Sequence, residues 1–201
     1  LAAERTAYVP NLLAGGGASN RTRLVAAVVP TIAGPVFLET VQALTEALAE
    51  KGYQLMLGQS GYDNSREDAL IDAIDGPRRD GIGLTAIMRW AGGRRRLLAS
   101  GIPVVETWDL TPTPVDMLVG FSHEQVGLAT AQFLHRKGYR RPAIVTGDDR
   151  RAHLRRAGFE QAWKALGGAA VPVRDVPAPT TLGSGGAALS GLLASDAGIH
   201  V

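Results

Sequence analysis

Short apolar runs alternate with amphipathic runs along most of the chain. The apolar runs have the length of strands, and their continuous Val, Ile and Leu content is typical of strands buried in a parallel sheet. We expect strands at residues 23–30, 53–58, 80–85, 103–107, 117–120, 142–147, 171–176 and 198–201. We expect helices at residues 36–51, 64–74, 93–100, from 122 past 133, 151–166 and 185–195. This alternation predicts an α/β fold in which helices flank parallel sheets.

Several expected helices carry signals at their ends and along one face. Ser122 followed by Gln125 matches a capping box, and Gly52 stands where a glycine usually ends a helix. The expected apolar faces are Val126, Ala129 and Phe133 in one helix and Phe159, Trp163 and Leu166 in the next.

The strands and helices form two series that divide near Gly120. About five strands precede this point and about three follow it. The strand-like run at 198–201 has no following helix to cover its sheet. We therefore expect two lobes with parallel sheets, of which the second is incomplete.

Composition favours a globular protein and says little about its partners. Hydrophobic residues make up 45% of the chain, and no apolar run is long enough to span a membrane, so no membrane partner is expected. The absence of cysteine excludes disulfides and thiolate metal sites and fits a reducing compartment. A formal net charge of +2 is too mild by itself to indicate nucleic-acid binding.

Polar and aromatic side chains follow several expected strands at their carboxyl ends. Ligands bind beyond these ends in open parallel sheets, and the planar fork of arginine suits a carboxylate or vicinal hydroxyl groups. Alternatively, Asp148 and Asp149 cap the next helix and Arg155 lies at the surface. The side chains that could form a polar-ligand site are Thr31, Phe37, Thr85, Glu106, Trp108, Asp109, Asp148, Asp149, Arg150, Arg151 and Arg155.

Enzyme chemistry is poorly supported by the sequence. It has no phosphate-binding loop and no metalloprotease helix motif, and its four histidines lack the spacing of metal ligands. A capping serine explains Ser122 beside His123 better than a nucleophile and its base. We expect no catalytic residue, no metal and no cofactor.

Eight sequence blocks, taken in order, resemble the LacI family of bacterial transcription regulators. The blocks are "YVPN", "RLVAAVVPTIAGPVF", "GYQLMLGQSGYDNSREDALI", "RRDGIGLT", "GIPVVETWD", "VGFSHEQVGLATAQFL", "GYRRPAIVTG" and "RRAGFEQAW". The resemblance covers essentially the whole chain. It is greatest to the gluconate-repressor branch, in which "PVVE…D" and "VGF" recur.

This resemblance implies a cytoplasmic, DNA-binding repressor with a two-lobed core like that of periplasmic binding proteins. In the family, an effector binds between the lobes of a homodimer and changes its affinity for operator DNA. The implied effector is a sugar or a sugar acid such as gluconate. The implied domains are the tail of the DNA-binding headpiece (1–7), a hinge or linker (8–21), an N-terminal lobe (22–120) and a partial C-terminal lobe (121–201).

The family's functional positions carry over residue by residue. Phe37 matches an aromatic that packs on the effector, Thr85 a polar strand-end position, and Arg155 the effector-binding arginine. The implied effector-binding residues are Thr31, Phe37, Thr85, Glu106, Asp109, Arg151 and Arg155. The implied DNA-hinge residues are Tyr8, Pro10, Asn11, Leu12 and Leu13.

The hinge departs from the family pattern at two positions. Leu12 replaces an arginine that often follows Asn11, and Gly17 stands where the family places a leucine that wedges into the minor groove. Three consecutive glycines at 15–17 each disfavour a helix by about 1 kcal/mol relative to alanine. We therefore expect residues 12–20 to be irregular without DNA.

Two other functional classes fit an α/β chain of this kind. A solute-binding protein for sugar transport would share the fold, but "YVPN" ahead of the first strand and the lack of a secretory signal favour the regulator. A sugar-processing enzyme is disfavoured because no nucleophile–base pair or phosphate loop is evident, and fold alone does not establish function.

Overall fold

The computed structural model describes residues 22–32, 35–61, 70 and 79–195. The expected hinge and the strand expected at 198–201 lie outside these residues, as does nearly all of the helix expected at 64–74. The chain divides into two compact units, residues 1–120 and 121–201.

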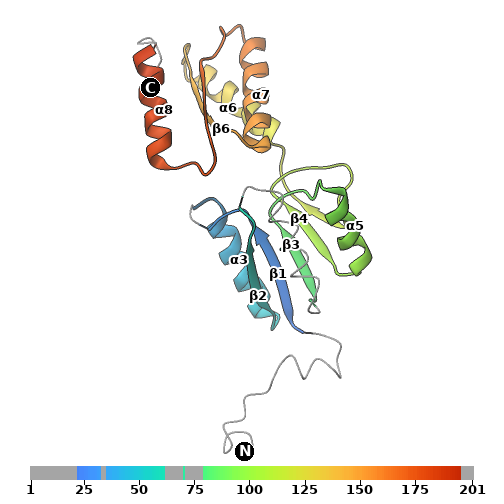
Figure 1. The fold of residues 1–201 in the computed structure, drawn as a ribbon. Helices are drawn as coiled ribbons and strands as arrows, with labels where there is room; N and C mark the ends of the chain where they lie inside the picture. Colours follow the sequence, from blue (N-terminus) through green and yellow to red (C-terminus); the bar gives the residue numbers. More distant parts are fainter. Residues whose placement is uncertain (1–21, 33–34, 62–69, 71–78, 196–201) are drawn as a thin grey trace, which may run out of the picture. The chain divides into compact units, whose positions relative to one another are not determined.

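The first unit is built on a parallel sheet of five strands in the order β2-β1-β3-β4-β5 (Figure 1). The strands are β1 (Leu24–Val29), β2 (Gln54–Gln59), β3 (Gly81–Leu84), β4 (Val104–Thr107) and β5 (Met117–Val119). The helices described in this unit are η1 (Pro35–Phe37), α3 (Leu38–Glu50) and α5 (Ala91–Ser100).

The strand order places a switch point between β1 and β3. Val25 of β1 pairs with Leu55 of β2 on one side and with Gly81 of β3 on the other. The chain therefore runs in one direction across the sheet from β1 to β2 and in the opposite direction from β3 to β4. Right-handed crossovers then place α3 and α5 on opposite faces of the sheet. Ligands of such sheets bind outside the carboxyl ends of the strands at the switch point.

The core of the first unit follows from the apolar character of its central strands. Residues 26–29 of β1 are all buried, as expected for a strand covered on both faces. The core cluster comprises Ala26, Val28, Ile82, Leu84, Met88, Leu97, Val104 and Val115. Ala26 and Val28 of β1 and Ile82 and Leu84 of β3 all belong to this cluster, so both strands are packed into the core.

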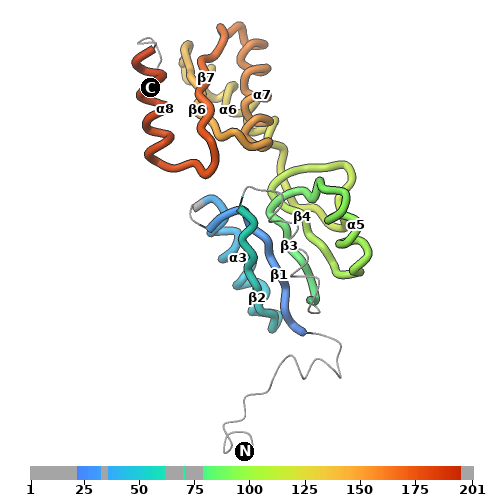
Figure 2. The backbone as a smooth tube through the Cα atoms, in the orientation of Figure 1, coloured from blue at the N-terminus to red at the C-terminus, as the bar shows by residue number. Residues whose placement is uncertain are grey.

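The second unit contains a parallel pair of strands and three helices within the described residues. These elements are α6 (His123–Arg136), β6 (Ile144–Gly147), α7 (Arg150–Ala165), β7 (Val173–Val176) and α8 (Leu182–Ser195). Figures 1 and 2 show α6 beside α7 on one side of the strand pair and α8 on the other side. The core of this unit is formed by Ala131, Phe159, Ala162 and Trp163.

Each strand and helix expected within the described residues is present, with ends shifted by a few residues. Ser122 caps α6, because its Oγ accepts a hydrogen bond of 3.2 Å from the N–H of Gln125. The helix end expected at Gly52 is also confirmed, since α3 ends at Glu50 and Gly52, just after the C-cap Lys51, has a φ of +75°. The capping predictions were therefore correct at both positions.

The apolar face expected for α6 is not its buried face. Val126 and Phe133 are 40% and 48% exposed, whereas the buried residues of α6 are His123, Gly127 and Ala131. The buried face is therefore the one with the smaller side chains. In α7 the expected inner residues Phe159 and Trp163 are buried, but Leu166 is exposed at the helix end.

Two glycines explain why α6 turns its small residues inward. A Cβ atom added to Gly127 would lie 1.9 Å from the carbonyl oxygen of Arg155. A Cβ atom added to Gly158 would lie 2.2 Å from the carbonyl oxygen of Glu124. The backbones of α6 and α7 therefore approach so closely that no side chain fits between them at either point.

Candidate functional site

Polar side chains lie at the carboxyl edge of the first sheet, on both sides of the switch point. Thr31 follows β1 and Thr85 follows β3. Thr85 is buried, and its N–H and Oγ1 both donate to the carbonyl oxygen of Val28, at 3.0 and 3.1 Å. These two bonds hold Thr85 in register with the end of β1.

Phe37 and Trp108 form an aromatic pair in the same unit. Phe37 is only 3% exposed, and its ring meets that of Trp108 edge-to-face with the centroids 5.0 Å apart. Trp108 follows β4 with a φ of +68°, which is a strained conformation for so bulky a residue. Trp108 is the more exposed of the two residues, since Phe37 is buried and Trp108 only partly so.

Glu106 is fully buried at the end of β4 and joins two neighbouring loops. Its Oε1 accepts a hydrogen bond of 2.6 Å from the N–H of Met88, and its Oε2 accepts one of 2.7 Å from the N–H of Val115. Such charge-assisted bonds compensate for burial of the carboxylate. In this geometry Glu106 ties the segment after β3 to the segment before β5.

Asp109 is also buried, and its carboxylate stabilises the turn after β4. One oxygen accepts a hydrogen bond of 2.8 Å from the N–H of Leu110, and the other lies 3.4 Å from the guanidinium of Arg89. A Cβ atom added to Gly120 would lie 2.0 Å from the carbonyl oxygen of Asp109. The backbone at Asp109 is therefore held by close packing as well as by hydrogen bonds.

In the second unit, two candidate arginines lie at the start of α7. Asp149 caps this helix, since its Oδ1 accepts hydrogen bonds of 2.8 and 3.1 Å from the N–H groups of Arg151 and Ala152. The capping alternative is therefore confirmed for Asp149. Arg151 also lies near this carboxylate, with 3.9 Å between its Nε and Oδ1.

Arg155 follows one turn later and contacts a buried histidine. Its Nη1 lies 2.9 Å from Nδ1 of His123, the first residue of α6, which is 2% exposed. The ring of His123 in turn meets the ring of Phe121 edge-to-face, with centroids 4.9 Å apart. The guanidinium of Arg155, a residue of α7, is therefore held in place by a contact with the first residue of α6.

The contact of His123 with Arg155 was not foreseen from the sequence. In the sequence His123 stands out only as the neighbour of a capping serine, and it lies 32 positions before Arg155. No spacing rule links residues of two different helices. A weak signal exists in Gly127 and Gly158, because glycines inside two expected helices suggest a close approach of their backbones.

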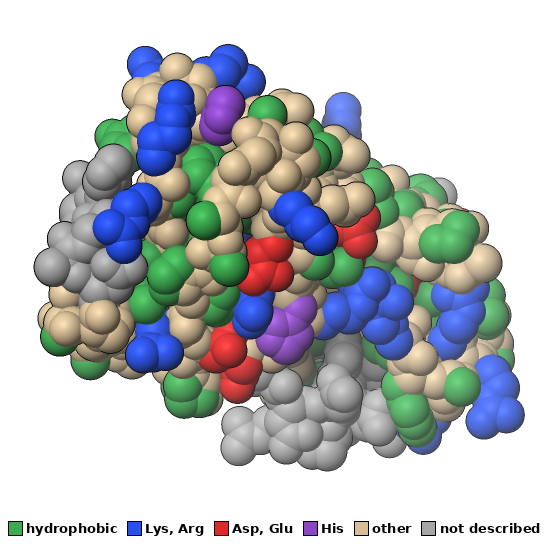
Figure 3. All heavy atoms as spheres, turned by 90° about the horizontal axis from the view of Figure 1, so that it is seen from above, with side chains coloured by type: hydrophobic (Ala, Val, Ile, Leu, Met, Phe, Trp, Pro, Cys, Tyr) green, Lys and Arg blue, Asp and Glu red, His purple; other side chains and the backbone are tan. Residues whose placement is uncertain are grey.

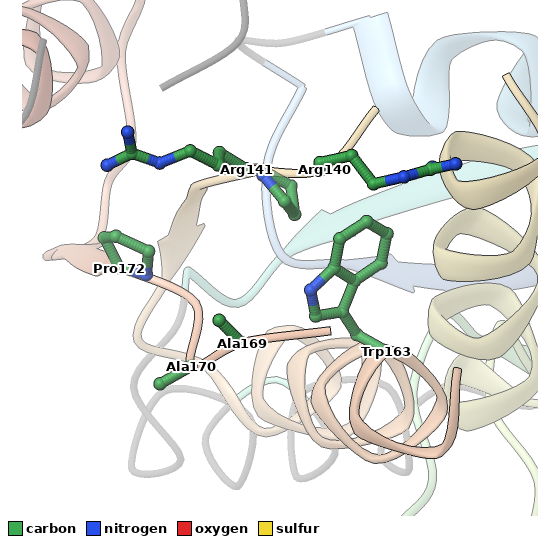
Figure 4. Close-up of a pocket in the computed structure, with 7 residues that line it drawn as sticks. Arg140, Arg141, Trp163, Ala169, Ala170 and Pro172 are labelled. Carbon is green, nitrogen blue, oxygen red and sulfur yellow. The ribbon is translucent and has the colours of Figure 1, made fainter. Parts of the chain in front are cut away.

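A separate small cavity lies at the amino ends of β6 and β7, whereas α7 with its candidate arginines begins after the carboxyl end of β6. It has a volume of about 160 Å³ and is lined by Arg140, Arg141, Pro142, Trp163, Ala169, Ala170 and Pro172 (Figure 4). Pro142 and Pro172 precede the two strands, so the cavity is at their amino ends. Its volume is below the roughly 300 Å³ at which ligand pockets begin.

Other site types find no support in the described part of the chain. No cluster of three His, Asp or Glu side chains there could hold a metal ion. No helix among the described residues has both the length and the apolar character needed to cross a bilayer. On the face shown in Figure 3, Lys and Arg side chains are scattered and not gathered into one stripe.

Comparison with known proteins gives a consistent family relationship. Residues 22–184 match the model of the family described as periplasmic binding proteins and sugar-binding domain of the LacI family. The chain is 34% identical over 198 residues to the HTH-type transcriptional regulator GntR of Pseudomonas aeruginosa, covering 97% of this chain and 57% of the relative. The chain thus spans about half the length of the curated relatives that it matches.

Solved structures of similar proteins agree with this relationship. A LacI-family regulator from Silicibacter pomeroyi is 29% identical with a TM-score of 0.84, over 96% of this chain and 59% of that one. The regulator GntR from Chromobacterium violaceum is 30% identical with a TM-score of 0.80, over 87% and 65% of the two chains.

Proposed function

Because the chain belongs to the family of periplasmic binding proteins and LacI-type sugar-binding domains, we propose that it is the effector-sensing core of a DNA-binding regulator. Its effector is a sugar or a sugar acid, with gluconate as the first candidate. The regulator acts as a repressor whose affinity for operator DNA changes when the effector binds. This proposal follows the regulators among its relatives and not the transport proteins that share the fold.

Each unit, taken by itself, has side chains whose chemistry suits a sugar or a sugar acid. In the first unit, the Trp108 ring, packed on Phe37, offers an apolar surface for the C–H face of a sugar. Thr31 and Thr85 supply hydroxyl groups at the carboxyl edge of the sheet. In the second unit, Arg151 and Arg155 supply positive charge for a carboxylate.

The observation that carries the proposal is the setting of Arg155. An exposed arginine has many rotamers and loses entropy when it binds a ligand. Arg155 is partly buried and bonded to the buried His123. A guanidinium held in this way is suited to pair with a carboxylate at a lower entropic cost.

Calorimetric titration of the full-length gene product with gluconate tests this assignment. Arg155→Ala should weaken gluconate binding by roughly 10- to 100-fold, because a charge-assisted hydrogen bond contributes about 1.5–3 kcal/mol. Arg156→Ala is a matched control, since Arg156 pairs with Glu160 and Asp175 on the same unit. This control should bind gluconate like the wild type.

Equal binding by the Arg155 and Arg156 variants would remove Arg155 from the site. Binding of a neutral sugar and not of gluconate would keep the sensing role and change the effector class.

We also propose that the full-length protein functions in the cytoplasm as a homodimer on operator DNA. Sedimentation of the full-length protein would test the dimer.

A further inference from the structure

The contact between His123 and Arg155 has only one chemically consistent hydrogen-bond direction. A guanidinium has five N–H donors and no acceptor, so the nitrogen facing it must accept. The atom 2.9 Å from Nη1 of Arg155 is Nδ1 of His123. The imidazole ring is therefore neutral in this contact, with its proton on Nε2.

The packing of the two helices fixes where this contact can form. His123 and Gly127 lie four residues apart on one face of α6, and Arg155 and Gly158 lie three residues apart on α7. The glycines bring the two backbones together one turn away from the contact. The Phe121 ring against His123 further limits rotation of the imidazole.

The bond to His123 uses one side of the planar guanidinium group, the side that carries Nη1. Nη1 takes part in this bond, while Nε and Nη2 form the other side of the planar group. That side presents two parallel N–H bonds, which is the geometry that pairs with both oxygens of a carboxylate.

We propose that His123 is the positioning residue for Arg155. Its unprotonated Nδ1 accepts the Nη1–H bond and sets the Nε–Nη2 edge to receive the carboxylate of an acidic effector. This inference rests on the proposed effector role of Arg155. His123 itself does not contact the ligand, so its contribution is made through the orientation of the arginine.

The first test measures the bond itself in the full-length protein, without any ligand. Hydrogen–nitrogen correlation spectra of the histidine side chains should show His123 protonated at Nε2 and unprotonated at Nδ1. A proton on Nδ1 would overturn the proposal. The side-chain N–H signals of Arg155 should also exchange slowly in the wild type and rapidly in His123→Leu.

The second test compares three substitutions of His123 by titration with gluconate. His123→Asn places its carbonyl oxygen near the position of Nδ1, so it should keep the affinity within roughly threefold of the wild type. His123→Gln places its acceptor farther out and His123→Leu has none, so both should lose roughly 10-fold or more. Equal affinities of the Asn and Leu variants would overturn the proposal.

Thermal unfolding of the same variants separates positioning from stability. The Asn and Gln variants should unfold at similar temperatures, although only the Asn variant retains affinity. If the wild type does not bind gluconate, the proposed effector class fails. The Arg155 exchange rates in the Asn and Leu variants then still decide the role of His123, since equal rates would exclude it.

Discussion

Buried polar side chains hold the candidate site at the scale of single residues. Glu106 and His123 are almost fully buried, and each accepts hydrogen bonds from a named partner. A buried acceptor that loses its donor, or a donor that loses its acceptor, costs more free energy than the bond itself contributes. These two residues should therefore tolerate substitution poorly, although neither was expected from the sequence to have a bracing role.

Replacing Glu106 tests this view. Glu106→Gln keeps one carbonyl oxygen but turns an NH₂ group toward the N–H of Met88 or Val115. The free energy of unfolding should fall by about 1–3 kcal/mol, because one buried N–H is left without an acceptor. Urea denaturation measures the change. Glu50→Gln, at an exposed position of α3, is the control and should alter stability by less than about 0.5 kcal/mol.

At the scale of elements, the hydrophobic pattern predicted which segments are strands and helices but not which face of α6 is buried. The pattern favoured Val126, Ala129 and Phe133, whereas the structure buries His123, Gly127 and Ala131. The helical period of a sequence shows only where apolar residues repeat along a helix. The close approach of α6 to α7 depends on the absence of side chains at Gly127 and Gly158, which a hydrophobicity pattern does not register.

Two glycine substitutions in the same unit should have opposite effects. Gly127→Ala places a methyl group against the Arg155 carbonyl and should reduce the free energy of unfolding by about 1–3 kcal/mol. Gly191→Ala lies in α8 with nothing within 4 Å of the added Cβ atom, so it should raise stability by about 0.5–1 kcal/mol. Urea denaturation of both variants measures the difference. Equal effects would mean that helix propensity, and not packing, decides the outcome at Gly127.

At the scale of the whole molecule, effector sensing requires that ligand binding and DNA binding be coupled. Coupling is reciprocal, so a ligand that changes DNA affinity must itself bind with different affinity when DNA is present. The candidate ligand groups of this chain belong to two compact units.

Mobility-shift titration of the full-length gene product measures this coupling on genomic DNA fragments selected by the protein. Gluconate should change the affinity of the wild type for its selected fragment. Arg155→Ala should bind the same fragment equally well without gluconate but respond only at a roughly 10- to 100-fold higher gluconate concentration. Loss of DNA binding in this variant without gluconate would indicate a structural defect and contradict the assignment.

The sequence by itself determined the fold class, the family, and the strands and helices that lie within the described residues, because periodicity, capping residues and ordered motif blocks are local or linear properties. It also identified the strand-end residues, since parallel topology places all carboxyl ends at one edge of a sheet. Only the tertiary structure decided that Glu106 braces two loops and that His123 accepts a bond from Arg155. Those contacts join residues that are distant in sequence, and their geometry depends on how closely the backbones pack.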